Sequence, residues 1–283
     1  MQDPDSDPDP GAPERPGGAC PARWRRLPLL FGLLALAVLA AGALAVLGLG
    51  GPAAGPPPVG AAHVGASSDG YRVWERRADG QPVRWDPCSP IDVVLSPDGA
   101  PAGARHDLEE AVDRLRAATG LDLHVIGTTD ERPSGARLPY QPERYGERWA
   151  PVLVAWGHPH EDGVPLRDID RGVGIPVALG GAGDRVYISG QIVLNAERED
   201  LVPGFADRAT SWGATLVHEL AHVLGLDHVD DPAALLHRYP GEGPIRFASG
   251  DLAGLRAIGA SGGCLGVPAP RPVVVEPAVG ARA

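Results

Sequence analysis

The chain has 283 residues, of which 43% are hydrophobic, so it can bury one sizeable core and still carry further segments. Its 39 glycines and 31 prolines predict long linkers and irregular loops. All the basic residues are arginine. The formal net charge of -11 excludes nucleic acid as a main partner, because phosphate contacts need a basic surface.

The N-terminal part is predicted to cross a membrane. Residues 1–26 begin as a run of Asp, Pro and Gly and read as a disordered cytoplasmic tail. Residues 27–50 are apolar and would form a helix about 36 Å long, enough to span the hydrocarbon layer of about 30 Å. The preceding arginines favour a cytoplasmic N-terminus and a catalytic domain outside a cell membrane. The alternative is a signal sequence, whose cleavage would release a secreted protein.

Residues 51–70 are a Gly/Pro/Ala-rich linker, and 267–283, broken by prolines, are predicted to be a disordered tail. The folded unit is therefore expected over 71–266. Cys88 and Cys264 lie near its two ends, which predicts a disulfide in an oxidising compartment, two unpaired thiols being the alternative. Cys20 lies beside the apolar segment and is expected to be a free thiol or an acylation site.

Within this unit the apolar residues show alternating strand and helix spacing. A strand is predicted around 91–95 and a helix over 104–120. Further strands are expected at 121–127, at 150–156, where a continuous apolar run indicates burial on both faces, and at 184–195. A second long helix is expected to carry the histidines, and a last short helix is expected over 250–259. This order predicts an α/β (α+β) domain with one mixed sheet.

The stretch "HELAHVLGLDH", His218 to His228, carries the chemistry. Side chains four residues apart share a helix face, so His218 and His222 can converge on one zinc ion. Glu219 lies about 100° round the helix, beside the metal face but off the ligand line. Gly225 can end the helix with positive φ and turn His228 back as third ligand. Three protein ligands leave the fourth position for water, as in a catalytic zinc site.

A bare H-E-x-x-H also occurs by chance, and a helical histidine pair is often only a polar face. The full H-E-x-x-H-x-x-G-x-x-H pattern on an amphipathic helix favours the zinc interpretation. This stretch resembles the metzincin zinc metallopeptidases, most of all the matrixins and their bacterial relatives.

The resemblance implies a zincin/metzincin catalytic domain over 71–266, here preceded by a single transmembrane helix. Its mixed twisted sheet would have five strands, with a backing helix, an active-site helix and a C-terminal helix. The implied activity is zinc-dependent hydrolysis of protein or peptide substrates outside the cytoplasmic membrane. Metal ligands would be His218, His222 and His228, with Glu219 as the catalytic general base for a zinc-activated water. Substrates would lie along an edge strand, expected at 150–156 or 184–190.

The sequence departs from the family at a turn that normally holds a methionine beneath the zinc. The only methionine is Met1, and Leu236 is the expected substitute, a swap that usually costs under about 1.5 kcal/mol. Val229 follows the third histidine where matrixins often have serine. Tyr239 is expected to pack, the alternative being to hold an oxyanion. A catalytically inactive binding module that retains zinc is the competing function, and the intact Glu219 favours the enzyme.

Two weaker metal sites are considered. His158, His160 and Asp162 could hold a second, structural zinc, although a solvated loop is favoured. Asp168 and Asp170, beside two glycines, could bind Ca2+ through oxygen ligands, but the loop lacks a tight calcium-binding pattern.

Overall fold

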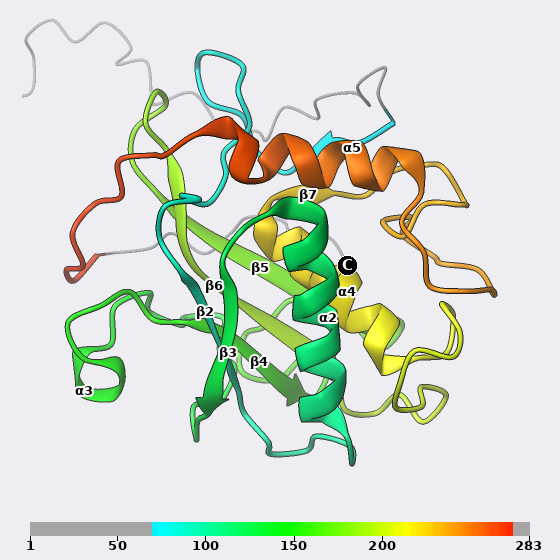
Figure 1. The fold of residues 1–283 in the computed structure, drawn as a ribbon. Coiled ribbons are helices and arrows are strands. Elements are labelled where there is room, and N and C mark those ends of the chain that lie inside the picture. The colour runs from blue at the N-terminus through cyan, green and yellow to red at the C-terminus, as the bar shows by residue number, and fades with distance from the viewer. Residues whose placement is uncertain (1–69, 274–283) are drawn as a thin grey trace, which may run out of the picture. The chain divides into compact units, whose positions relative to one another are not determined.

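Five strands form one mixed sheet in the computed structural model, which describes residues 70–273 (Figure 1). The strand order is β3-β2-β4-β6-β5, with β5 antiparallel to β6 and the other neighbours parallel. The strands are β2 (Ile91–Leu95), β3 (Leu123–Thr128), β4 (Val152–Gly157), β5 (Gly172–Leu179) and β6 (Val186–Asn195). The predicted α/β (α+β) class with a mixed sheet is therefore confirmed.

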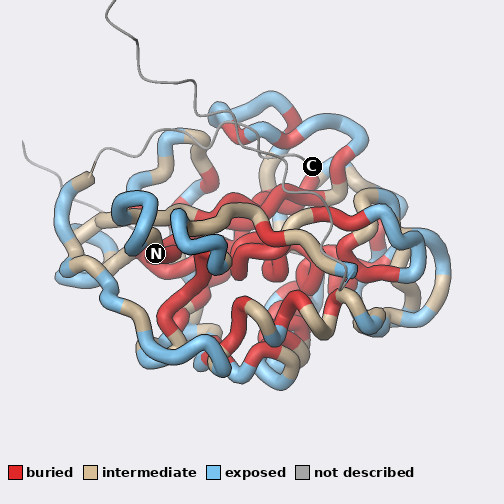
Figure 2. The backbone as a smooth tube through the Cα atoms, turned by 90° about the horizontal axis from the view of Figure 1, so that it is seen from above, coloured by how far each residue is buried: buried red, intermediate tan, exposed pale blue. Residues whose placement is uncertain are grey.

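The two long helices pack on one face of this sheet, and the short helix at residues 142–145 lies with loops on the other face. The helices are α2 (Ala104–Thr119), α3 (Pro142–Tyr145), α4 (Trp212–Leu224), α5 (Ser249–Ile258) and the 3-10 turn η1 (Ala260–Gly262). Residues Val93 and Val154 join the core formed with α2 and α4, whereas Val94 and Leu153 face the opposite side. Figure 2 shows the buried backbone running through the middle and the exposed segments around it. The expected burial of the 150–156 strand on both faces is confirmed.

The strand β5 was not predicted. Its sequence "GVGIPVAL" contains two glycines and a proline, which hide the strand pattern. Proline is tolerated because β5 is an edge strand with β6 on one side only within residues 70–273. The expectation that 150–156 or 184–190 would supply the substrate edge is wrong: β4 lies between β2 and β6, and β6 lies between β4 and β5.

Two short strands tie the start of the domain to the segment after α4. β1 (Arg72–Val73) pairs antiparallel with β7 (Leu226–Asp227). The backbone N–H of Trp74 also donates to the carbonyl of Gly225 at 2.8 Å. This pairing, which the sequence did not indicate, fixes the chain where it leaves α4.

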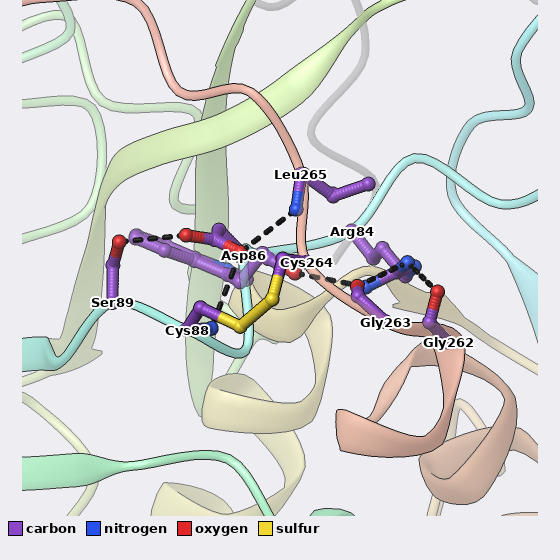
Figure 3. Close-up of a disulfide and its surroundings, with 9 residues drawn as sticks. Arg84, Asp86, Cys88, Ser89, Gly262, Gly263, Cys264 and Leu265 are labelled. Carbon is purple, nitrogen blue, oxygen red and sulfur yellow. Dashed lines mark hydrogen bonds between the residues drawn. A yellow bond between two sulfur atoms is a disulfide. The ribbon is translucent and has the colours of Figure 1, made fainter.

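The predicted disulfide between Cys88 and Cys264 is confirmed (Figure 3). Beside it, the carboxylate of Asp86 accepts the backbone N–H groups of Cys88 at 3.2 Å and Leu265 at 2.9 Å. Arg84 donates to the carbonyls of the residues just before Cys264. Hydrogen bonds and the disulfide therefore join the two ends of the domain together.

Within residues 70–273, no helix is both long and apolar enough to cross a membrane. The predicted tail 1–26, the apolar segment 27–50 and the linker up to residue 69 lie outside the described residues, as do 274–283. Residues 267–273 have no regular secondary structure, but the carbonyl of Pro268 accepts the indole N–H of Trp149 at 2.9 Å.

Candidate metal centre

Helix α4 is buried along its whole length, although it carries two histidines and a glutamate. Its apolar side chains, including Leu216 and Leu220, pack in the core as the helical spacing predicted. His218, Glu219 and His222 are 7%, 6% and 2% exposed. Ionisable groups at such depth are costly unless they are paired, hydrogen-bonded or bound to a metal.

Gly225 turns the chain back towards the histidines, as predicted. Its φ of 118° ends α4, and its N–H donates to the carbonyls of Ala221 and His222. A Cβ at this position would lie 2.8 Å from the ring of Tyr187, so larger residues are excluded both by conformation and by space. The short strand β7 then carries the chain to His228.

The three predicted ligands converge through their Nε2 atoms. These atoms are 3.0 Å apart between His218 and His222, and 3.2 Å from each of these to His228. Bonds of 2.0–2.1 Å in a tetrahedral zinc site separate nitrogen ligands by about 3.3–3.4 Å. The three buried histidines are therefore a group that could hold a metal ion, close to its bound spacing.

Hydrogen bonds on the far side of two rings define how these nitrogens are protonated. Nδ1 of His218 donates to the carbonyl of Leu235, and Nδ1 of His222 donates to that of Leu226, both at 2.8 Å. Each of these neutral rings then has an unprotonated Nε2, so two lone pairs face each other at 3.0 Å. Such lone pairs repel unless a cation lies between them, and the donor set therefore fits a metal.

Protonation does not provide that cation. Burial lowers the pKa of His218 to about 3, with the charges of neighbouring groups adding to the effect. Burial also lowers the pKa of His222 and of His228. Nδ1 of His228 is buried without a hydrogen-bond partner, and the nearest carboxylate oxygen, from Asp227, is 3.9 Å away. At neutral pH the three rings are uncharged, which is the state that binds metals.

Glu219 lies between α4 and β5, outside the ligand group. Burial raises its pKa to about 8, against the opposing effect of the Gly174 backbone N–H. The strand can approach this closely only because it has glycines there. A Cβ on Gly172 would lie 3.1 Å from Glu219 Cγ, and one on Gly174 would lie 2.4 Å from the Glu219 carbonyl oxygen. Glu219 therefore lies against β5 and lines the same cleft as His218 and His228. Its predicted role beside a bound metal remains a prediction.

The turn after His228 supports the site from below. Leu235 and Leu236 are each 2% exposed and belong to the main core. The carboxylate of Asp251, on α5, accepts the N–H groups of Leu235 at 2.7 Å and Leu236 at 3.3 Å. Leu235 supplies the carbonyl that orients His218. Leu236 is buried as the substitute for methionine would be, and its contact with the rings remains a prediction.

Several supporting residues were missed at the sequence level. Arg72 forms an ion pair with Asp230 at 2.6 Å and reaches the carbonyl of His228 at 3.4 Å. The ring of Trp74 meets that of His222 edge-on, with centroids 6.0 Å apart. These contacts span about 150 residues of sequence, so no local pattern marks them.

The weaker metal candidates do not come together. Nδ1 of His158 contacts Glu197 at 3.1 Å, whereas His160 pairs with Asp168 at 3.2 Å. Both carboxylate oxygens of Asp170 bind Arg167. Within residues 70–273, neither the proposed structural zinc site nor the calcium site forms a metal-ligand group.

An open cleft of about 390 Å³ lies beside the histidines. His218, Glu219 and His228 line it. Residues 169–172, parts of the segment 235–240 and the first turn of α4 complete the lining. Tyr239 is 65% exposed at this cleft, so the expected packing role for this side chain is wrong. The tyrosine is instead available to a bound molecule.

No family model matches the chain, and no curated protein shows significant sequence similarity to it. The functional argument therefore depends on the geometry of the three histidines, Glu219 and the cleft.

Proposed function

We propose that the chain is a zinc-dependent endopeptidase with a zincin/metzincin catalytic domain. One observation carries the proposal: three uncharged, buried histidines converge beside a buried glutamate in an open cleft. A purely structural site has no use for a carboxylate beside its ligands, and it needs no access for a substrate. Both features favour catalysis over a metal-stabilised binding module.

His218, His222 and His228 would hold the zinc ion through Nε2. Zinc bound there supplies a Lewis acid that polarises the scissile carbonyl and lowers the pKa of a water molecule. The charge of a zinc ion bound there would oppose the effect of burial and keep the Glu219 carboxyl ionised. A Glu219 carboxylate oxygen would then take a proton from the attacking water and pass it to the leaving amine nitrogen. The N–H of Gly174 and the close approach of β5 hold that carboxylate in position.

An extended substrate would pair with the outer edge of β5. Peptides commonly add to an exposed sheet edge through backbone hydrogen bonds. β5 begins at the cleft, since Gly172 lines it, so a peptide along this edge would reach Glu219. We also propose an extracytoplasmic location, because the Cys88–Cys264 disulfide suits an oxidising compartment.

The test uses the full chain purified in detergent, with zinc measured by metal analysis and cleavage measured on a peptide library. Glu219→Gln should retain zinc and lose activity by about 10²–10⁴-fold, because an amide cannot accept the proton. His228→Ala should lose both zinc and activity. The matched control is His106→Ala, an exposed histidine on α2, which should change neither.

The outcomes separate the two functions. Tight, stoichiometric zinc in His228→Ala would exclude this residue as a ligand. Full activity in zinc-loaded Glu219→Gln would exclude Glu219 as the base. A zinc-loaded wild-type chain that cleaves no peptide in the library would instead support the inactive binding module.

A further inference from the structure

The cleft beside the metal centre is rich in arginine, although the chain as a whole carries a formal net charge of -11. Four arginines line it: Arg171, Arg198, Arg208 and Arg238. Its only acidic lining residues within 70–273 are Asp170 and Glu219. What a substrate meets in the cleft depends on which of these charges are already compensated.

Two of the lining charges are neutralised by ion pairs. Arg198 binds both oxygens of Asp200 at 2.6 Å, and Asp170 is held by Arg167 at 2.7 Å. Neither pair adds much net charge to the cleft.

Arg171 and Arg208 keep their charge. Among residues 70–273, no carboxylate lies within the 4.0 Å of an ion pair from either guanidinium. Arg208 donates Nε to the carbonyl of Gly241 at 3.0 Å and Nη1 to that of Ala233 at 2.9 Å, which holds it in place without cancelling its charge. Arg171 is half-buried, and its burial and the nearby Arg198 lower the pKa of its guanidinium, whereas Asp200 and Asp207 oppose this from beyond ion-pair distance. A substrate carboxylate beside Arg171 would pair with it directly.

The arginines share the cleft with the candidate metal ligands. Arg171 and Arg238 line it together with His218 and His228. A peptide bound beside the histidines would therefore also meet these arginines.

We infer that the cleft binds a carboxylate of the substrate and that Arg171 is the main specificity-determining residue. A planar guanidinium pairs with a carboxylate through two hydrogen bonds, and a partly buried arginine that has no direct ion pair among residues 70–273 is suited to this. The substrates would be peptides with Asp or Glu close to the scissile bond. This inference rests on the proposed function, because it assumes that the bound peptide is cleaved. The binding of an acidic peptide can be tested without that assumption.

The first experiment measures cleavage by the zinc-loaded full chain. Peptides that differ only in Glu, Gln or Lys beside the cleaved bond are compared, with amidated and free C-termini. The Glu peptide should have a kcat/KM at least about tenfold above that of the Gln peptide, and Lys should be the poorest. Arg171→Gln should remove the preference while still cleaving the Gln peptide. Arg105→Gln, an exposed arginine of α2 outside the cleft, should preserve it.

The outcomes decide the source of the carboxylate as well as its role. An equal preference for Glu, Gln and Lys, or a preference that survives Arg171→Gln, would overturn the inference. A preference confined to peptides with a free C-terminus would show that the cleft binds the terminal carboxylate of the peptide and not an acidic side chain.

A second experiment removes the dependence on catalysis. Fluorescence anisotropy measures the binding of the same labelled peptides to zinc-loaded Glu219→Ala, with and without Arg171→Gln. Tighter binding of the Glu peptide that is lost with Arg171→Gln supports the inference even if the wild type cleaves nothing. Equal binding of the Glu and Gln peptides would overturn it even if the wild type is an active peptidase.

Discussion

Asp251 and His218 are connected through the backbone of a single residue, Leu235. The Asp251 carboxylate accepts the Leu235 N–H at 2.7 Å, and the Leu235 carbonyl accepts Nδ1–H of His218 at 2.8 Å. A carboxylate on the C-terminal helix α5 therefore sets the position of the carbonyl that orients a candidate metal ligand. Groups that orient ligands in this way commonly change metal affinity when they are removed.

Asp251→Asn should weaken zinc binding by about 10–100-fold, because an amide places N–H donors against the backbone N–H groups that the carboxylate now accepts. Competition with a chromophoric chelator measures the affinity. Asp113→Asn, at an exposed site on α2, is the control. Unchanged zinc affinity in Asp251→Asn would show that the Leu235 carbonyl holds its place without this carboxylate.

Leu236 is predicted to form the floor beneath the ligands. Leu236→Met should leave zinc binding intact and change stability by less than about 1.5 kcal/mol, since the two side chains are similar in volume. Leu236→Ala should cost about 2–5 kcal/mol, because the site is 2% exposed and a cavity would open. Thermal melts and peptidase assays measure both effects. If the alanine variant melts and cleaves like the wild type, Leu235 becomes the candidate for the floor.

Gly174→Ala should reduce activity and destabilise the fold by about 1–3 kcal/mol. The added Cβ would lie 2.4 Å from the carbonyl oxygen of Glu219 and 3.0 Å from Cβ of His222, so β5 must move away from α4. Gly183→Ala is the matched control, because a Cβ there meets nothing within 4 Å. Wild-type activity in Gly174→Ala would mean that the contact between β5 and α4 does not position Glu219.

The buried pair of Glu131 and Arg137 should give the domain an acid-sensitive stability. Burial opposes the charge of Glu131, but Arg137 together with Tyr145 and Gln141 outweighs burial and lowers the pKa of this carboxyl. A folded pKa below the unfolded value means stability that is present at neutral pH and lost as the pH falls through the folded pKa.

Glu131→Gln should therefore cost about 3–5 kcal/mol at neutral pH, since it leaves the Arg137 guanidinium buried without its counterion. The difference from the wild type should shrink as the pH is lowered. Thermal melts across an acid series measure it, with Glu109→Gln on α2 as the exposed control. A difference that stays constant with pH would contradict the linkage.

Features encoded over a few neighbouring residues could be read from the sequence alone. The apolar spacing of α2, its end at Gly120 and the burial of β4 follow from local periodicity and glycine conformation. The convergence of His218 and His222 follows from the helix repeat, and the return of His228 follows from Gly225. The Cys88–Cys264 disulfide could be predicted because only one partner was suitably placed at each end of the domain.

Other features depend on contacts between distant segments. β5 is an edge strand, and its glycines let it approach Glu219 on α4. The same glycines hide the strand pattern in the sequence, so two strands that are interior in the sheet were expected to supply the edge. Asp251 acts on His218 only because α5 lies against the turn that contains Leu235. Arg171 and Arg208 are far apart in the sequence. They line the same cleft only because the segments around β5 and α4 meet in the fold. Helix and strand periodicity specify which face of an element is apolar, whereas the packing of those faces decides which side chains become neighbours.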